Sequence, residues 1–291
     1  MPVSQLSDRG VLRVTGEDAR HFLHSLVTND IESLGRGEAR FAALLTPQGK
    51  IIADFFVIAS HHTDDDFWID CPKALAPELA KRLGFYKLRA KVAIADLSGT
   101  HAILACWDDA NPETENGVAF TDPRFAPLGS RLIVDQALAS SLASHPASLW
   151  QTHRIMLGIP EGGKDFTYSD AFPHEADMDL LNGVDFRKGC YVGQEIVSRT
   201  HHRGTARTRS VLVQFPAGVS APEGVEIHAG TKMVGTLGSS APEGHAIALL
   251  RLDRVQEAMA AGEPLSAGGL PLRILRPEWV PPAILEGASH A

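Results

Sequence analysis

Runs of apolar residues separated by turn-forming residues organise the first half of the chain. Alternating or continuous apolar positions predict strands at residues 9–14, 38–45, 50–59, 66–71, 88–97, 101–107 and 130–135. Two of these strands flank Thr46-Pro47-Gln48-Gly49, in which the proline presets the turn and the glycine relieves its exit. The pattern therefore predicts a β-hairpin over residues 38–59.

Apolar residues at helical spacing predict helices at residues 15–30, 75–84, 146–157 and 193–202. The first helix opens with a weak capping-box pattern from Thr15 to Asp18, and Gly84 and Gly158 are interpreted as helix ends. Because strands, helices and hairpins are intermixed, the predicted fold class is α+β with mainly antiparallel pairing. The sequence has no glycine-rich dinucleotide fingerprint and no phosphate loop.

The pattern changes after about residue 205. Short strand candidates separated by Gly and Pro follow at residues 209–215, 225–229, 231–240, 245–252 and 270–277. This spacing is typical of a small barrel or sandwich. We therefore predict a first region at 1–204, a β module at 205–285 and a short tail at 286–291.

Composition and charge limit the function. The chain has 291 residues, 44% of them hydrophobic, and no run near the roughly 20 apolar residues that cross a bilayer. Its first residues, MPVSQLSDRG, do not resemble a signal peptide, so we expect cytoplasmic residence and no membrane partner. The net charge of −8 argues against direct nucleic-acid binding. Two basic stretches, 81–91 and 199–209, are either solvated faces or sites for an anionic small molecule.

The three cysteines differ in their surroundings. They are widely spaced and form no CxxC pair, which predicts free thiols and neither a disulfide framework nor a zinc site. Cys71 and Cys106 lie within strand patterns and are expected to be core thiols. No metal site is predicted elsewhere, because the adjacent histidine pairs lack the spacing of known metal motifs.

Cys190 lies in the segment KGCYVGQE, among Lys188, Gly189, Tyr191, Gly193, Gln194 and Glu195. Arg187 and Lys188 are cations that favour a thiolate over a thiol, so Cys190 is the strongest candidate for a functional thiol. The two glycines permit unusual backbone shapes and close approach of another molecule. The residues alone leave a second interpretation open, a tight turn into a helix with the thiol tucked inward.

This segment, together with FPHEADMDLLNGVDF (172–186) and IVSRTHHRG (196–204), resembles the signature of the YgfZ family. These are folate-binding proteins related to the glycine-cleavage T-protein, an aminomethyltransferase, and implicated in maintaining iron-sulfur enzymes. Further resembling segments span nearly the whole chain, at residues 22–31, 44–57, 85–92 and 154–162.

The resemblance implies a ring of three parts. Two interleaved α+β subdomains form residues 1–204, the second of them at roughly 47–120, and a β-barrel follows. Tetrahydrofolate or a derivative is expected in a central cavity, with the cysteine loop at its rim. Arg154 is expected to pair with a folate carboxylate, and Asn29 and Asp54 to contribute further contacts.

Departures from the T-protein pattern guide the functional hypothesis. Ala53 precedes Asp54 where the T-protein has adjacent aspartates, and residues 124–129 supply no glutamate for the pterin. The resemblance therefore implies a folate-dependent accessory factor for iron-sulfur cluster assembly or repair, with iron-sulfur client enzymes or assembly proteins as partners. The alternatives are an aminomethyltransferase, and a tRNA-modification factor acting directly or through an iron-sulfur enzyme. We expect a monomer.

Overall fold

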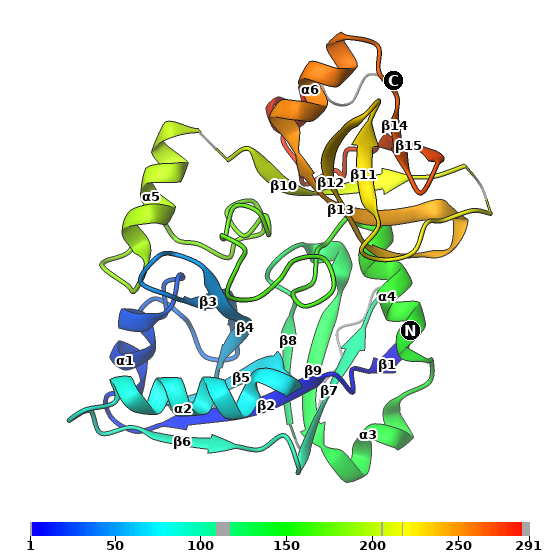
Figure 1. Cartoon of the computed structure of the whole chain (residues 1–291). Coiled ribbons are helices and arrows are strands. Elements are labelled where there is room, and N and C mark those ends of the chain that lie inside the picture. Colours follow the sequence, from blue (N-terminus) through cyan, green and yellow to red (C-terminus); the bar gives the residue numbers. More distant parts are fainter. Residues whose placement is uncertain (1, 109–116, 205, 217, 287–291) are drawn as a thin grey trace. The chain divides into compact units, whose positions relative to one another are not determined.

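The computed structural model describes residues 2–108, 117–204, 206–216 and 218–286, and it divides the chain into two compact units (Figure 1). Unit 1 comprises Met1–Trp150 and Leu181–Ile196, and unit 2 comprises Gln151–Leu180 and Val197–Ala291. The predicted tail at 286–291 lies outside the described residues except for Glu286. Helices α4 (Ala147–Met156) and α5 (Gln194–Arg203) each contain a boundary between the units.

A five-stranded antiparallel sheet forms the first layer of unit 1. Its order is β3 (Ala39–Leu45), β4 (Ile51–Ala59), β5 (Asp66–Pro72), β2 (Arg9–Thr15) and β6 (Ala93–Asp96). The predicted hairpin joins β3 to β4, with the Gly49 amide donating to the Thr46 carbonyl at 2.8 Å. Gly49 has φ +80°, a conformation that glycine adopts without strain, so the turn prediction is confirmed.

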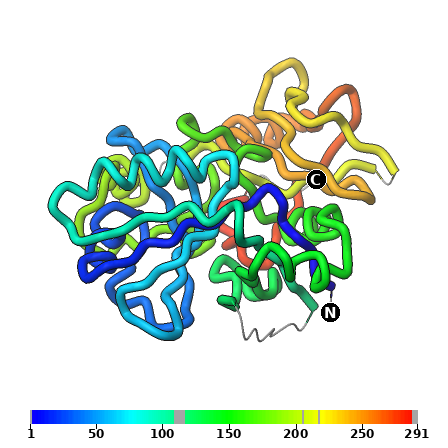
Figure 2. Tube along the Cα trace, turned by 90° about the horizontal axis from the view of Figure 1, so that it is seen from below, coloured from blue at the N-terminus to red at the C-terminus, as the bar shows by residue number. Residues whose placement is uncertain are grey.

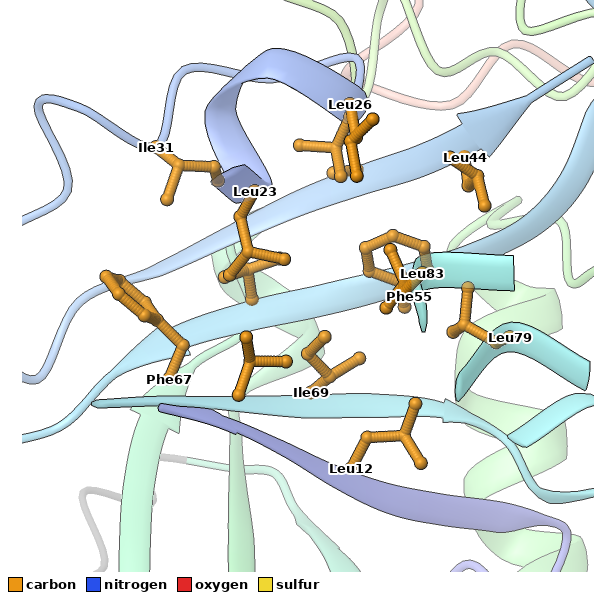
Figure 3. Packing of buried hydrophobic residues seen from close by; sticks show 14 of the residues in the cluster. Leu12, Leu23, Leu26, Ile31, Leu44, Phe55, Phe67, Ile69, Leu79 and Leu83 are labelled. Atoms are coloured by element: carbon orange, nitrogen blue, oxygen red, sulfur yellow. The ribbon is translucent and has the colours of Figure 1, made fainter. Parts of the chain in front are cut away.

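Helices α1 (Ala19–Leu26) and α2 (Ala76–Tyr86) pack on this sheet (Figure 3). Phe22, Leu23 and Leu26 of α1 are buried because they recur at helical spacing on one face. Leu79 and Leu83 do the same for α2, and both sets contact apolar residues of the sheet such as Phe55 and Ile69. This layer is the main core of unit 1.

A four-stranded antiparallel sheet forms the second layer of unit 1. Its order is β1 (Val3–Gln5), β7 (His101–Cys106), β9 (Ser130–Asp135) and β8 (Gly117–Thr121), and it is accompanied by α3 (Gln136–Leu142). A buried ionic network joins the two sheets, because Arg131 of β9 pairs with Asp70 of β5 at 2.8 Å and with Asp122 at 3.2 Å. The Arg131 guanidinium also stacks 4.4 Å from the Phe56 ring centroid.

Unit 2 contains a closed six-stranded barrel, which confirms the predicted β module. The barrel order is β10 (Thr208–Gln214), β13 (His245–Arg251), β12 (Lys232–Ser240), β11 (Glu226–Ala229), β14 (Leu265–Ala267) and β15 (Leu270–Ile274). Helices α6 (Leu252–Ala260) and α7 (Pro282–Leu285) contribute to its core through Val255 and Leu285. Together with the antiparallel sheets of unit 1, the barrel confirms the predicted α+β class.

Three local predictions are wrong. The helix predicted at 15–30 spans only Ala19–Leu26. The capping box from Thr15 to Asp18 does not form, because Asp18 precedes α1 and its Oδ2 accepts a hydrogen bond from the Lys91 amide at 2.7 Å. Gly84 does not end α2, which continues to Tyr86, since this glycine does not adopt the left-handed conformation that ends helices. The strand predicted at 88–97 pairs only over Ala93–Asp96, and residues 87–92 form a turn with Leu88 at φ +43°.

Candidate functional site

The loop before α5 exposes the thiol that the sequence singles out. Cys190 is exposed, whereas Cys71 and Cys106 are buried. Burial raises the pKa of the Cys71 thiol to about 12 and that of the Cys106 thiol to about 11. The structure therefore places Cys190 where another molecule can reach it and keeps the other two thiols in the core.

Lys188 fixes the start of this loop on the end of α1. Its ammonium donates to the carbonyls of His24, Val27 (2.7 Å) and Asn29 (3.0 Å). A lysine there satisfies carbonyls that have no partner within the helix and opposes the negative end of the helix dipole. Burial lowers the pKa of Lys188 to about 8, against the attraction of nearby carboxylates such as Asp30 and Asp185. We refer to this arrangement as the Lys188 clamp.

Gly193 fixes the end of the loop on the β3–β4 turn. It has φ +82°, and a Cβ on it would lie 2.5 Å from the Thr46 carbonyl oxygen. Gly49 of the turn is also close to this segment, because a Cβ on Gly49 would lie 3.0 Å from the Ile196 side chain. Gly189 is different, because a Cβ there would have no other atom within 4 Å. The fold of this chain therefore requires Gly193 but not Gly189.

The remaining residues of the motif have distinct environments. Tyr191 is only 8% exposed, and its buried hydroxyl has no hydrogen-bond partner among the described residues. Burial raises the pKa of Tyr191, and the Lys188 ammonium lies 5.2 Å from its ring centroid. Gln194 begins α5 and makes a 3.5 Å contact to the Gly189 carbonyl, while Glu195 is exposed.

A pocket of about 730 Å³ lies beside the loop, within unit 1. It is lined by Asn29, Asp30, Ser33, Arg40, Pro123, Asn182, Val184, Asp185, Phe186 and Arg187. The Asp185 carboxylate accepts hydrogen bonds from the Arg187 amide (2.7 Å) and the Lys188 amide (3.2 Å), so one turn connects the pocket wall to the cysteine loop. Burial opposes ionisation of Asp30, but hydrogen bonds from Ser33 outweigh it and lower the pKa of this carboxyl.

The predicted folate contacts do not all reach this pocket. Asn29 lines it, with its side-chain amide donating to the carbonyls of Phe41 (2.7 Å) and Asn182 (2.6 Å). Asp54 does not line the pocket and is instead buried in β4. Burial alone would lower the pKa of Arg124, but the carboxylate of Asp122, and to a smaller extent that of Asp54, raise it.

Arg154 does not line the pocket either, because it lies in unit 2 and is 1% exposed. Its guanidinium nitrogens lie 2.8 Å from carboxylate oxygens of Glu161 and Asp165 and 2.8 Å from the Ser239 hydroxyl. The same residue type that could bind a folate carboxylate is therefore occupied by carboxylates of the chain itself. Its role toward folate stays a prediction, and the geometry favours a structural role.

Sequence reasoning did not single out Arg40, Asn182 and Asp185 of the pocket wall. Arg40 had a signal, because it is the one basic residue inside the apolar run of β3. Asn182 and Asp185 lie within the segment 172–186 that carries the family resemblance, but nothing in that segment assigned either of them a role. Arg187 was noted for its charge beside the thiol, and the structure places it in the pocket wall.

Brief treatment of the folded protein with iodoacetamide is expected to modify Cys190 well before Cys71 or Cys106. Access and thiolate fraction together set cysteine reactivity, and burial reduces both at the two core thiols. Mass spectrometry of peptides at successive times measures the order. Equal labelling of all three thiols under native conditions would show that the loop does not distinguish Cys190.

Two sequence families match parts of the chain. The family described as "GCVT N-terminal domain" matches residues 3–107, and the family described as "CAF17, C-terminal beta-barrel domain" matches residues 207–282. The first covers most of the two sheets of unit 1, and the second covers the barrel.

A full-length relative decides the family. The chain is 31% identical to the "Iron-sulfur cluster assembly factor IBA57 homolog, mitochondrial" of Chaetomium globosum, over 99% of this chain and 74% of that protein. The chain belongs to the IBA57 family of iron-sulfur cluster assembly factors. It is also 33% identical to the IBA57 homolog of Mycosarcoma maydis over 73% of this chain, but it spans little more than half, 57%, of that protein. IBA57 family membership confirms the resemblance drawn from the cysteine motif.

A solved structure confirms the fold of this IBA57 family member. The glycine cleavage system aminomethyltransferase T from Bartonella henselae superposes with a TM-score of 0.77 over 96% of this chain and 86% of that chain. At 14% identity, this likeness shows the shared fold alone.

The relatives correct the predicted location. Cytoplasmic residence is wrong, because the IBA57 relatives that match most of the chain are named as mitochondrial proteins. The composition of the first residues was therefore a poor guide to the compartment. Among the described residues, no helix has the length and apolarity needed to span a bilayer.

Proposed function

We propose that the chain acts in iron-sulfur cluster assembly or repair and that Cys190 is its functional thiol. One observation carries the proposal: the loop is fixed at both ends, by the Lys188 clamp and by Gly193, and yet it exposes the thiol between them. Free cysteines are usually buried, so the exposure of Cys190 is not explained by a loop that serves only to lead into α5. Family membership supports iron-sulfur cluster assembly as the process.

The pocket beside the loop is the proposed folate site. Its volume of about 730 Å³ lies within the range of small-molecule pockets. The Asp30 and Asp185 carboxylates suit the N–H groups of a pterin, and the Arg40 and Arg187 guanidiniums suit the carboxylates of a glutamate tail. The residues present thus fit tetrahydrofolate, which supplies one-carbon chemistry when bound. This proposal moves the tail contact from Arg154 to arginines of unit 1.

Calorimetry with tetrahydrofolate tests the pocket. Arg187→Ala and Arg40→Ala are each expected to weaken binding by about 1.5–3 kcal/mol, the usual contribution of a hydrogen bond to a charged group. Arg36→Ala is the matched control, because Arg36 is an exposed arginine of unit 1 that pairs with Asp64 and does not line the pocket. Wild-type affinity in both pocket variants would place folate elsewhere.

The proposed process is tested in a host that lacks its own homologue of this chain. Expression of the wild-type chain is expected to restore the activities of iron-sulfur enzymes and to leave enzymes without clusters unchanged. Failure to restore them, with soluble folded protein present, would separate this chain from the process for which its relatives are named.

A further inference from the structure

An exposed apolar and basic turn projects from unit 1 at the end of α2. Phe85, Tyr86 and Leu88 are 68%, 41% and 91% exposed, which makes them three of the large apolar side chains that the fold leaves in solvent. They alternate with basic residues in the sequence KRLGFYKLRAK at 81–91. We name Lys81, Phe85, Tyr86, Lys87, Leu88 and Arg89 the basic apolar tip. In Figures 1 and 2 the turn from α2 to β6 lies at the outer edge of unit 1.

The backbone beneath the tip holds these side chains outward. The Ala90 amide donates to the Lys87 carbonyl at 2.7 Å, and the Lys91 amide donates to the Asp18 carboxylate at 2.7 Å. Gly16 lies so close below that a Cβ on it would be 2.1 Å from the Lys91 carbonyl oxygen. Leu88 has φ +43°, an unfavourable conformation for a leucine that this support maintains. The turn is therefore built and is not a loose end of the helix.

The charge of the tip is opposite to that of the chain. Residues 79–95 contain five basic residues and no acidic one, whereas the whole chain has a net charge of −8. Arg82 pairs with Glu78, and Lys91 pairs with Glu17. Among the described residues, Lys81, Lys87 and Arg89 form no ion pair with a carboxylate. The Lys81 ammonium lies 5.9 Å from the Phe85 ring centroid, so cation and apolar surface are adjacent. An anionic surface would attract this tip, although the chain as a whole carries a net negative charge.

We propose that the basic apolar tip binds the surface of an anionic lipid bilayer. Phe85, Tyr86 and Leu88 would enter the region between headgroups and acyl chains, while the lysines and Arg89 contact lipid phosphates. A lipid surface fits better than a folded protein partner because the tip side chains offer hydrogen-bond donors and, apart from the Tyr86 hydroxyl, no acceptor. The expectation of no membrane partner rested on the lack of a spanning segment and of a signal-peptide pattern, and surface binding requires neither. This inference is independent of Cys190 and of the folate pocket.

Co-sedimentation with vesicles of equal parts phosphatidylglycerol and phosphatidylcholine tests the proposal. The wild-type chain is expected to sediment with these vesicles at low salt, to be released at high salt, and to ignore pure phosphatidylcholine. Two double variants, Phe85→Ser with Leu88→Ser and Lys87→Gln with Arg89→Gln, are each expected to lower the partition at least about tenfold. Leu142→Ser is the control, because Leu142 is a 46% exposed leucine of α3 with no lysine or arginine between Arg131 and Arg154.

Two outcomes would overturn the proposal. The first is no sedimentation of wild type with anionic vesicles, and the second is unchanged sedimentation of both double variants. In one case of the first outcome, the double variants fold by circular dichroism but no longer restore iron-sulfur enzymes in the host. That result would assign the tip to a protein partner, and a failure of wild type itself in the host would instead concern the proposed function alone.

Discussion

Arg154→Leu is expected to lower the free energy of unfolding by about 3–5 kcal/mol, the cost of breaking a buried ion pair by removing one partner. The substitution keeps a large apolar side chain and so limits the cavity, but it leaves Asp165 with a fully buried carboxylate and no countercharge. Asp165 also accepts hydrogen bonds from the amides of Glu161 and Ser239, each at 2.8 Å, so the pair ties α4 to the following loop and to β12. Urea unfolding followed by circular dichroism measures the loss.

The matched control for this variant is Arg36→Leu. Arg36 forms a similarly short pair with Asp64, but both side chains are more than half exposed, and solvent screens such pairs so that they contribute little to stability. A loss below about 1 kcal/mol in Arg154→Leu would contradict the structural role and return Arg154 to the list of ligand contacts.

Lys188→Met is expected to remove most of the ability of the chain to restore iron-sulfur enzymes, because the loop that holds Cys190 loses its attachment to α1. The expected loss of stability is smaller than that of Arg154→Leu. Hydrogen bonds from a charged donor contribute about 1.5–3 kcal/mol, and the variant also escapes the cost of burying an ammonium, so we expect a net loss of about 1–2 kcal/mol. Complementation and urea unfolding, measured on the same variant, separate the two effects.

The pH dependence of stability tests whether the Lys188 ammonium is buried in the clamp. The folded pKa of Lys188 is lowered to about 8 from 10.5, so above about pH 8 the unfolded state binds more protons than the folded state. The contribution of Lys188 to the free energy of unfolding is therefore constant below about pH 8 and rises with pH between about pH 8 and pH 10.5. Between these two pH values the free energy of unfolding of wild type should increase relative to that of Lys188→Met. The control Lys232→Met, which changes an exposed lysine of β12, should follow wild type. A parallel course of wild type and Lys188→Met would contradict the burial of the Lys188 ammonium.

Much of the fold could be predicted because its signals are local. The hairpin at Gly49 follows from a turn sequence between two apolar runs, and the barrel follows from short strands punctuated by Gly and Pro. The errors occur where tertiary contacts override a local signal. The residues from Thr15 to Asp18 resemble a capping box, but the Asp18 carboxylate accepts a hydrogen bond from the Lys91 amide, 73 residues away. The strand expected from Leu88 is bent into a turn.

The candidate site was predictable only in part. The polar and glycine-rich neighbours of Cys190 indicated a functional thiol but left an inward-facing one open, and the structure decides for an exposed thiol. The role of Lys188 could not be predicted, because its partners are backbone carbonyls more than 150 residues earlier in the chain. Every residue has such a carbonyl, so the sequence does not indicate which of them a lysine will contact. Arg154 shows the reverse error, since an arginine suited to a bound carboxylate can equally pair with a carboxylate of its own chain, here Asp165.

The most direct test of the central claim is the restoration of iron-sulfur enzyme activities by Cys190→Ser in the host that lacks its own homologue. The variant removes one exposed sulfur and is expected to change stability by less than about 0.5 kcal/mol, so that a loss of function cannot be ascribed to unfolding. Cys106→Ala, which alters a buried thiol, is the control and should restore activity at permissive temperature. We predict that Cys190→Ser accumulates as folded protein and restores none of the activity. Full restoration by Cys190→Ser would contradict the account and reduce the motif to a structural turn.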